Sequence, residues 1–155
     1  STDSEGLTEA IRVSQYNQVH HSTLLELVTT GASDLQAGDI IFYDYVAQSP
    51  NLDWYDMHPL TYVREIDSFL QQFNGGNIHY LRPSIRQAVG KSFASGGTTY
   101  PAKCHHKYFM SAASNIYLVP PEYFTDYVPL PLEQFLFTRA GVKVEVPSSF
   151  IWSKV

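Results

Sequence analysis

The sequence predicts a mainly β domain with short helices (α+β), arranged as a small, partly open β-barrel. Short runs of β-branched and aromatic residues alternate with glycine and proline turns, and only two or three brief segments carry helix signals. A chain of 155 residues with 44% apolar residues can build one hydrophobic core, and no internal repeat is present. We therefore expect one domain over residues 38–155, preceded by an N-terminal arm over residues 1–37.

The arm is polar and contains a single aromatic residue, Tyr16. Thr23 and Glu26 have the spacing of a capping box, and the apolar residues after Thr23 end at Gly31. This pattern predicts a short helix over residues 23–30. Because so short a helix is not stable alone, we expect it to pack on the domain or on a neighbouring subunit.

The first half of the domain begins with its clearest strand signal, the β-branched and aromatic run over residues 40–46 after Gly38-Asp39. Residues 49–59 have the composition of a loop, with Trp54 and Tyr55 as its anchors. The periodicity of residues 60–66 fits a helix or a strand. Residues 77–81 fit a strand that follows a break at Gly75-Gly76.

The second half of the domain predicts two short helices, a flexible loop and several strands. One helix starts at Pro83 and ends at Gly90, and the other covers residues 101–114 from Pro101, with the loop at 94–99 between them. Strands separated by proline turns are predicted at 115–119, at 127–132, around Val142, Val144 and Val146, and at 150–152.

The composition excludes several classes of protein. Ten Lys and Arg stand against fifteen Asp and Glu, and no basic run occurs, so wholesale phosphate binding is disfavoured. The single cysteine, Cys104, excludes an internal disulfide. No segment has the about 18 apolar residues of a membrane span, and residues 1–6 lack the layout of a signal peptide. We expect a soluble, non-secreted chain without membrane contact.

Two histidine pairs, His20-His21 and His105-His106, are the first candidates for metal ligands, and Cys104 precedes the second pair. Adjacent side chains point in different directions on a helix or a strand, so neither pair can chelate a metal through both rings. The spacings of known zinc sites are absent, and the glycine pairs 75–76 and 96–97 match no phosphate-binding loop. We expect no metal and no cofactor.

Asp56, His58 and His79 are the candidate residues for the acid–base chemistry of a small hydrolase. Asp56 and His58 would face the same side of an extended chain, but Pro59 indicates a turn, and no G-x-S-x-G motif is present. A hydrolase would require these groups to meet in an open cleft. We expect no catalytic residue and keep the hydrolase as an alternative.

Four basic residues could form a strip that binds nucleic acid. Arg82 and Arg86 lie one turn apart on the first predicted helix, and Lys103 and Lys107 are four apart on the second. In a chain of net charge −5, such a strip is more often a solvated face or an interface with an acidic partner. DNA contact is therefore possible but not favoured.

Four ordered segments resemble a family of phage proteins. They are Gly38-Asp39-Ile40-Ile41-Phe42-Tyr43-Asp44-Tyr45, Asn51-Leu52-Asp53-Trp54-Tyr55-Asp56-Met57-His58-Pro59-Leu60, Gly76-Asn77-Ile78-His79-Tyr80-Leu81-Arg82-Pro83 with Arg86, and Leu130-Pro131-Leu132-Glu133-Gln134-Phe135. Over residues 38–135 the chain resembles small virion-associated proteins of T-even-type contractile-tailed phages (myoviruses). Trp54 stands where this family has a Tyr, and residues 67–75 are longer than its hairpin.

The resemblance implies an SH3-like or related small barrel in which residues 60–66 and 77–81 are strands. It implies a non-enzymatic virion component, assembled in the host cytoplasm, that docks in the tail, baseplate or neck, with a head-completion or DNA-end-binding protein as the alternative. In this fold Asp56 accepts backbone N–H groups and His79 is paired in a strand. The partners are other virion proteins and further copies of the chain.

The aromatic content is consistent with such a role. Eleven Tyr, nine Phe and two Trp are more than one core of this size is expected to bury, and interfaces favour aromatic residues. We expect the surplus to form contact surfaces, and the arm and residues 150–152 to reach a neighbour.

Overall fold

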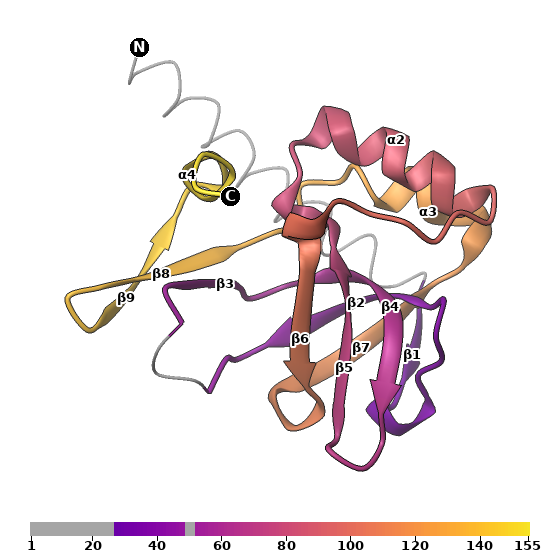
Figure 1. Ribbon diagram of the computed structural model, residues 1–155, viewed down its shortest axis with the longest axis horizontal. Coiled ribbons are helices and arrows are strands. Elements are labelled where there is room, and N and C mark those ends of the chain that lie inside the picture. The colour runs from indigo at the N-terminus through magenta and orange to yellow at the C-terminus, as the bar shows by residue number, and fades with distance from the viewer. Residues whose placement is uncertain (1–26, 49–51) are drawn as a thin grey trace.

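Two antiparallel sheets and a few short helices form the chain (Figure 1). The computed structural model describes residues 27–48 and 52–155. The larger sheet has the order β1-β7-β2-β4-β5-β6, with strands β1 (Val28–Thr30), β2 (Ile40–Tyr45), β4 (Leu60–Asp67), β5 (Gln72–Asn77), β6 (His105–Phe109) and β7 (Ala113–Val119). The smaller sheet has the order β3-β8-β9, with strands β3 (Trp54–Asp56), β8 (Phe135–Arg139) and β9 (Val142–Val146).

The helices lie at two places around the sheets. Helices α2 (Pro83–Ala94) and α3 (Phe124–Tyr127) pack together at one end of the larger sheet, and α4 (Ser148–Trp152) follows the smaller sheet (Figure 1). Single 3₁₀ turns connect the elements: η1 (Ala32–Asp34), η2 (Ile78–Tyr80), η3 (Ala102–Cys104), η4 (Met110–Ala112) and η5 (Pro121–Tyr123). No helix in the described parts of the chain has the length and apolarity that crossing a membrane requires.

The predicted class, mainly β with short helices, is confirmed. Neither of the two sheets closes into a barrel. In the described residues β1 and β6 each have a neighbouring strand on one side only, and β3 and β9 are the edges of the smaller sheet. Strand β1 lies within the predicted N-terminal arm and pairs with β7.

Strand β2 is the centre of the core. Its residues are buried almost without interruption because both faces of the sheet are covered. Ile40 and Phe42 pack in the cluster that includes α2 and α3, whereas Ile41 and Tyr43 point to the opposite cluster. This alternation follows from the period of two in a strand.

The second cluster is built from aromatic rings of four strands. Tyr43 makes edge-to-face contacts with Phe73 and Tyr108, each with ring centroids 5.6 Å apart, and Tyr45 approaches Tyr108 to 5.0 Å. Bulges in β2 and β4 interrupt the strand pairing beside this cluster. Bulges bend a strand and increase its twist, so the sheet can bring β6 close to β2.

The predicted break at Gly75-Gly76 is wrong, because both glycines lie inside β5. A Cβ atom on Gly75 would overlap the carbonyl oxygen of Tyr62, and one on Gly76 would meet the ring of Tyr100 at 2.6 Å. The glycines therefore permit close approach within the sheet instead of a turn. The strand predicted at 77–81 is also wrong beyond Asn77, since η2 follows there.

Two expectations near the N-terminus are corrected. The helix predicted at 23–30 is wrong for Val28–Thr30, which form β1 through hydrogen bonds to β7, while residues 23–26 lie outside the described residues. The loop predicted at 49–59 contains β3, which pairs with β8, and residues 49–51 lie outside the description. In both places the strand exists because of a partner far along the chain.

In the second half of the domain, the predicted helices differ from those of the structure. The helix predicted at 101–114 is wrong: this stretch contains η3, β6 and η4, and β6 pairs with β5. Buried Tyr108 lies between exposed Lys107 and Phe109, the alternation of a strand. The first helix does not end at Gly90 but continues to Ala94; a Cβ atom on Gly90 would lie 3.2 Å from the Val128 side chain, so the glycine permits close packing against Val128.

The strands predicted at 115–119 and around residues 142–146 are confirmed as β7 and β9, and β8 is a strand that the sequence analysis does not predict. The strand predicted at 127–132 is wrong, since α3 ends there and Pro129 and Pro131 remove the backbone donors of a strand. Residues 150–152 belong to α4, with Ile151 fully buried.

Replacement of Gly75 by Ala is expected to destabilise the fold by about 3 kcal/mol, since the new methyl group would collide with backbone. Urea unfolding measures the change. Gly31→Ala is the matched control, because its Cβ would meet nothing closer than an Asp34 oxygen at 3.4 Å. Equal stability of the two variants would contradict the packing described for β5.

Candidate functional site

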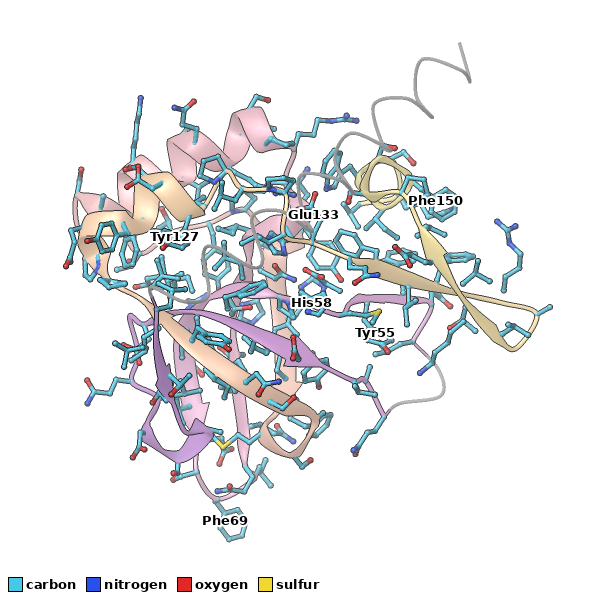
Figure 2. All side chains as sticks on the ribbon, turned by 180° about the vertical axis from the view of Figure 1, so that it is seen from behind. Tyr55, His58, Phe69, Tyr127, Glu133 and Phe150 are labelled. Atoms are coloured by element: carbon cyan, nitrogen blue, oxygen red, sulfur yellow. The ribbon has the colours of Figure 1, made fainter. Side chains whose placement is uncertain are left out.

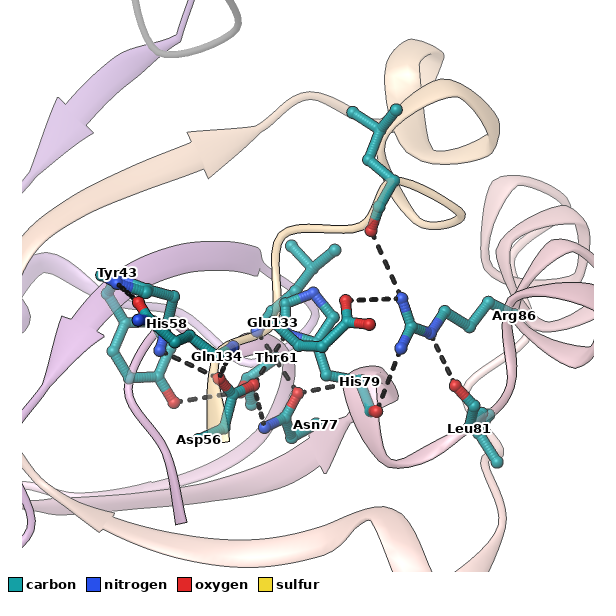
Figure 3. Close-up of polar contacts among 12 residues, drawn as sticks. Tyr43, Asp56, His58, Thr61, Asn77, His79, Leu81, Arg86, Glu133 and Gln134 are labelled. Atoms are coloured by element: carbon teal, nitrogen blue, oxygen red, sulfur yellow. Dashed lines mark hydrogen bonds and ion pairs between the residues drawn. The ribbon is translucent and has the colours of Figure 1, made fainter. Parts of the chain in front are cut away.

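The carboxylate of Asp56 accepts four hydrogen bonds and is 2% exposed (Figure 3). Its Oδ1 accepts the backbone N–H groups of His58 at 3.0 Å and Gln134 at 3.1 Å. Its Oδ2 accepts the amide of Asn77 at 3.1 Å and Nδ1 of His79 at 2.7 Å. These bonds use all of the about four acceptor positions of a carboxylate.

Three of these four donors come from distant parts of the chain, whereas His58 is only two residues from Asp56. Asp56 ends β3, His58 precedes β4, Asn77 ends β5, His79 lies in η2, and Gln134 precedes β8. The Asn77 side chain also accepts the backbone N–H groups of Leu60 and His79. The cluster therefore joins the two sheets through hydrogen bonds between segments that are far apart in the sequence.

The electrostatics of the cluster favour a charged Asp56. Burial by itself would raise the pKa of this carboxyl group, but the charge and hydrogen bond of His79 and the backbone N–H donors outweigh burial and lower the pKa. Because the ionised carboxylate only accepts, Nδ1 of His79 carries the hydrogen of this bond.

His58 faces a different set of partners. Its Nδ1 lies 2.8 Å from Oδ1 of Asp44, and its Nε2 lies 3.1 Å from Oε1 of Gln134. Burial tends to lower the pKa of His58, but the hydrogen bond with Asp44 and the charges of Asp44 and Asp56 raise it overall. With an oxygen atom at each ring nitrogen, the site suits the protonated imidazolium.

A buried ion pair lies next to this cluster. Arg86 donates from its Nη1 to Oε2 of Glu133 at 3.0 Å, and both side chains are fully buried. Its other nitrogen atoms donate to the carbonyl groups of Leu81 and His79, which also accepts the indole N–H of Trp152. Arg86 thus links α2, η2, α4 and the segment before β8.

The burial of Arg86 corrects the predicted basic strip. Arg82, Lys103 and Lys107 are exposed, but Arg86 points into the protein toward Glu133. The four side chains do not share one surface. The DNA-binding alternative therefore lacks the convergence on which it depends.

Cys104, His105 and His106 do not form a metal site. Burial raises the pKa of the Cys104 thiol to about 12, and the described residues contain no group of three possible metal ligands. The His105 ring stacks on Tyr100, and His106 stacks on Tyr80 with its Nδ1 bonded to the carbonyl of Cys104. The pair His20-His21 lies outside the described residues.

An aromatic pocket of about 240 Å³ opens beside Asp56. Most of its lining is apolar or aromatic: Tyr45, Ala47, Gln48, Leu52, Trp54, Tyr55, Asp56, Tyr80, His106, Lys107, Tyr108 and Phe109. Burial lowers the pKa of His106, which favours the neutral ring in this wall. The pocket can hold an apolar or aromatic group of side-chain size.

The hydrolase candidates are brought together only in part. Asp56 and His79 form a buried pair and Asp56 lines the pocket, whereas His58 turns toward Asp44. The oxygens of Asp56 are occupied by four donors, and the described pocket lining contains no serine, threonine or cysteine. This arrangement connects chain segments and presents no activated nucleophile there. The prediction that Asp56 accepts backbone N–H groups is confirmed, but His79 lies in a 3₁₀ turn instead of a strand.

The roles of Glu133 and Gln134 are not predicted from the sequence, in which the two residues are noted only as part of residues 130–135. A signal was present, because Glu133 is the one charged residue between Asp126 and Arg139 in an apolar stretch. A lone charge in such a stretch is expected to be buried with a partner. Its identification with Arg86 required the tertiary structure.

No known protein family, curated protein or solved structure matches this chain. What this site can do is therefore judged from the geometry of the described residues.

Asp56→Asn is expected to destabilise the protein by about 4 kcal/mol. Either orientation of the amide turns an N–H group toward two donors and removes the charge opposite His79. Urea unfolding at pH 7 measures the loss. Asp53→Asn, the same change at an exposed position of the neighbouring loop, is the control and should stay within about 0.5 kcal/mol of the native protein.

The stability is also expected to fall in acid because of Asp56. Its pKa is lower in the folded than in the unfolded chain, so its contribution is complete above the ordinary aspartate pKa of about 3.9 and is lost as the pH falls below that value. Unfolding free energies between pH 6 and pH 3 should therefore decline less steeply in Asp56→Asn than in Asp53→Asn. Parallel profiles would contradict the assignment.

The ionisation of His58 is expected to give stability the opposite dependence on pH. Its folded pKa is raised, so its contribution is complete below the ordinary histidine pKa of about 6.5 and is lost as the pH rises through the folded value. We expect Asp44→Asn to reduce the loss of stability between pH 6 and pH 9, as measured by urea unfolding. An unchanged decline in this variant would show that Asp44 does not hold the proton on His58.

Proposed function

We propose that the chain is a non-enzymatic structural or assembly component of a contractile-tailed phage virion, and that it docks in the tail, baseplate or neck through apolar surfaces. The resemblance of four ordered segments over residues 38–135 to the phage proteins supports the phage part of this proposal. Its partners are other virion proteins and further copies of the chain.

One observation carries the docking role: large apolar side chains lie exposed at the ends of two hairpins. Phe69, in the turn between β4 and β5, is 92% exposed and points away from the rest of the chain (Figure 2). Val142, at the start of β9, is 62% exposed. Exposed apolar side chains on projecting hairpins are characteristic of surfaces that a partner covers.

The distribution of charged groups supports the same function. Asp56, His79, Arg86 and Glu133 are buried and bonded to each other or to the backbone, where they hold the segments together. The groups capable of acid–base chemistry thus maintain the scaffold, while apolar residues are available at the surface. This is the opposite of the arrangement in a hydrolase, whose reactive groups meet in an open cleft.

The aromatic pocket provides a second docking surface. Its size suits one apolar or aromatic side chain of a neighbouring protein, and aromatic anchors in pockets supply much of the energy of protein interfaces. The ammonium group of Lys143 lies 5.2 Å from the centre of the Tyr55 ring, so the rim of the pocket also carries a positive charge.

We also propose that the fold is SH3-like, that is, a partly open small barrel. The antiparallel pairing throughout the larger sheet and the bulges in β2 and β4 support it, since small barrels are curved by bulges. An experimental structure of the chain in its assembly, superposed on SH3-like domains, tests this part separately.

The docking role is tested by Phe69→Ser in a phage that lacks the native gene and receives the variant in trans. We expect normal stability, because the ring contacts solvent, but at least about tenfold less chain in purified particles, the effect of losing a contact of about 1.4 kcal/mol. Ser68→Ala, an exposed polar change in the same turn, is the control and should be incorporated normally.

A cryo-EM map of the intact particle completes the test. The proposal expects density for the chain in the tail, baseplate or neck, with Phe69 covered by a neighbour. Particles that contain no copy at any of these places would overturn it.

A further inference from the structure

Strand β9 forms one edge of the smaller sheet and has no strand on its outer side in the described residues. Its sequence, Val142-Lys143-Val144-Glu145-Val146, is exposed along most of its length, with Val144 41% exposed. An exposed edge with apolar side chains is a template for pairing with another strand.

The turn before β9 determines which backbone groups face outward. Ala140 and Gly141 both have positive φ, 51° and 78°, as in the two-residue type I′ hairpin turn. In such a hairpin the closing pair, Arg139 and Val142, is hydrogen-bonded, and hydrogen-bonded pairs then alternate along the ladder. The N–H and C=O groups of Lys143 and Glu145 therefore point away from β8.

The outward residues of β9 are complementary to themselves. If a second β9 approaches antiparallel with Val144 opposite Val144, then Lys143 of each copy lies opposite Glu145 of the other. Lys143 and Glu145 have outward backbone groups, so each such pair also exchanges two backbone hydrogen bonds. Val142 then lies opposite Val146, and the apolar face of the strand continues across the junction.

Other registers lose this match. A shift that centres the axis on Lys143 places two lysines opposite each other, and one centred on Glu145 places two glutamates together. A slip by one residue brings inward-facing backbone groups to the junction. The other sheet edges are not self-complementary, since β1 has no charged residue, β3 has Asp56 without a basic residue, and β6 has Lys107 without an acidic residue.

We propose that two copies of this chain pair antiparallel along β9, with the twofold axis at Val144. The pairing forms one continuous six-stranded sheet from the two three-stranded sheets, an isologous interface with the same residues on both sides. It is a property of the isolated chain and does not depend on the proposed place in a virion.

Charge reversal tests the pairing in the full chain by sedimentation velocity over a concentration series. Lys143→Glu alone and Glu145→Lys alone each put two like-charged pairs into the dimer, and we expect at least about tenfold weaker dimerisation, or 1.4 kcal/mol. The double variant K143E/E145K restores opposite charges and should restore the native dimer. Lys91→Glu, on an exposed position of α2, is the control and should leave dimerisation unchanged.

A disulfide trap tests the register. Val144→Cys brings two thiols together at a non-hydrogen-bonded pair, where Cα atoms are about 4.5 Å apart, within the range of a disulfide. We expect a covalent dimer on mild oxidation of this variant. Val142→Cys is the matched control and should not cross-link, since residue 142 faces Val146 of the second copy; the native Cys104 is buried.

The results separate the possibilities. A native chain that remains monomeric at 100 μM and shows no cross-link at position 144 overturns the proposal. So does a dimer that both single charge variants leave intact, because it must use another surface. A dimer in solution together with particles that lack the chain would support β9 pairing while contradicting the virion function.

Discussion

The buried carboxylate of Asp56 is the interaction on which the rest of the structure depends. One charged group receives hydrogen bonds from the start of β4, the end of β5, the turn η2 and the segment before β8. Burying a charge is costly, and only this full set of donors together with His79 compensates for it. Arg86 and Glu133 form a second buried charge cluster, an ion pair, beside Asp56. Arg86 of α2 and Trp152 of α4 both donate to the carbonyl of His79, so these two helices are attached to the turn η2.

The polar interior contrasts with parts of the surface. Charged side chains inside the protein join two small open sheets, while some apolar residues at the hairpin ends and sheet edges are exposed. Phe69, the aromatic pocket and the edge of β9 are separate surfaces, each of a kind that protein partners cover. Under our proposals, the edge of β9 pairs with a second copy and the other two surfaces contact neighbouring proteins.

Local patterns predicted the parts of the fold whose signals lie within one segment. The β-branched and aromatic run of β2, the alternating valines of β9 and Pro83 at the start of α2 indicated those elements correctly. The expectation that Asp56 accepts backbone N–H groups is also confirmed, whereas its contact with His79 is found only in the tertiary structure. The identity of each residue and the spacing of its neighbours were sufficient for these conclusions.

The tertiary structure decided what depends on distant partners. Residues 105–109 form a strand because β5 offers hydrogen bonds, although their own pattern also fits a helix. Gly75 lies in a strand because the backbone of Tyr62 passes close by, and Arg86 is buried because Glu133 lies 47 positions further along the chain. Composition alone determined that the chain is rich in aromatic residues and carries net negative charge. The packing of the two sheets around Asp56 determines which aromatic residues are exposed and which charges are paired inside. The sequence alone does not determine this, since burial and ion pairing are properties of the packed chain.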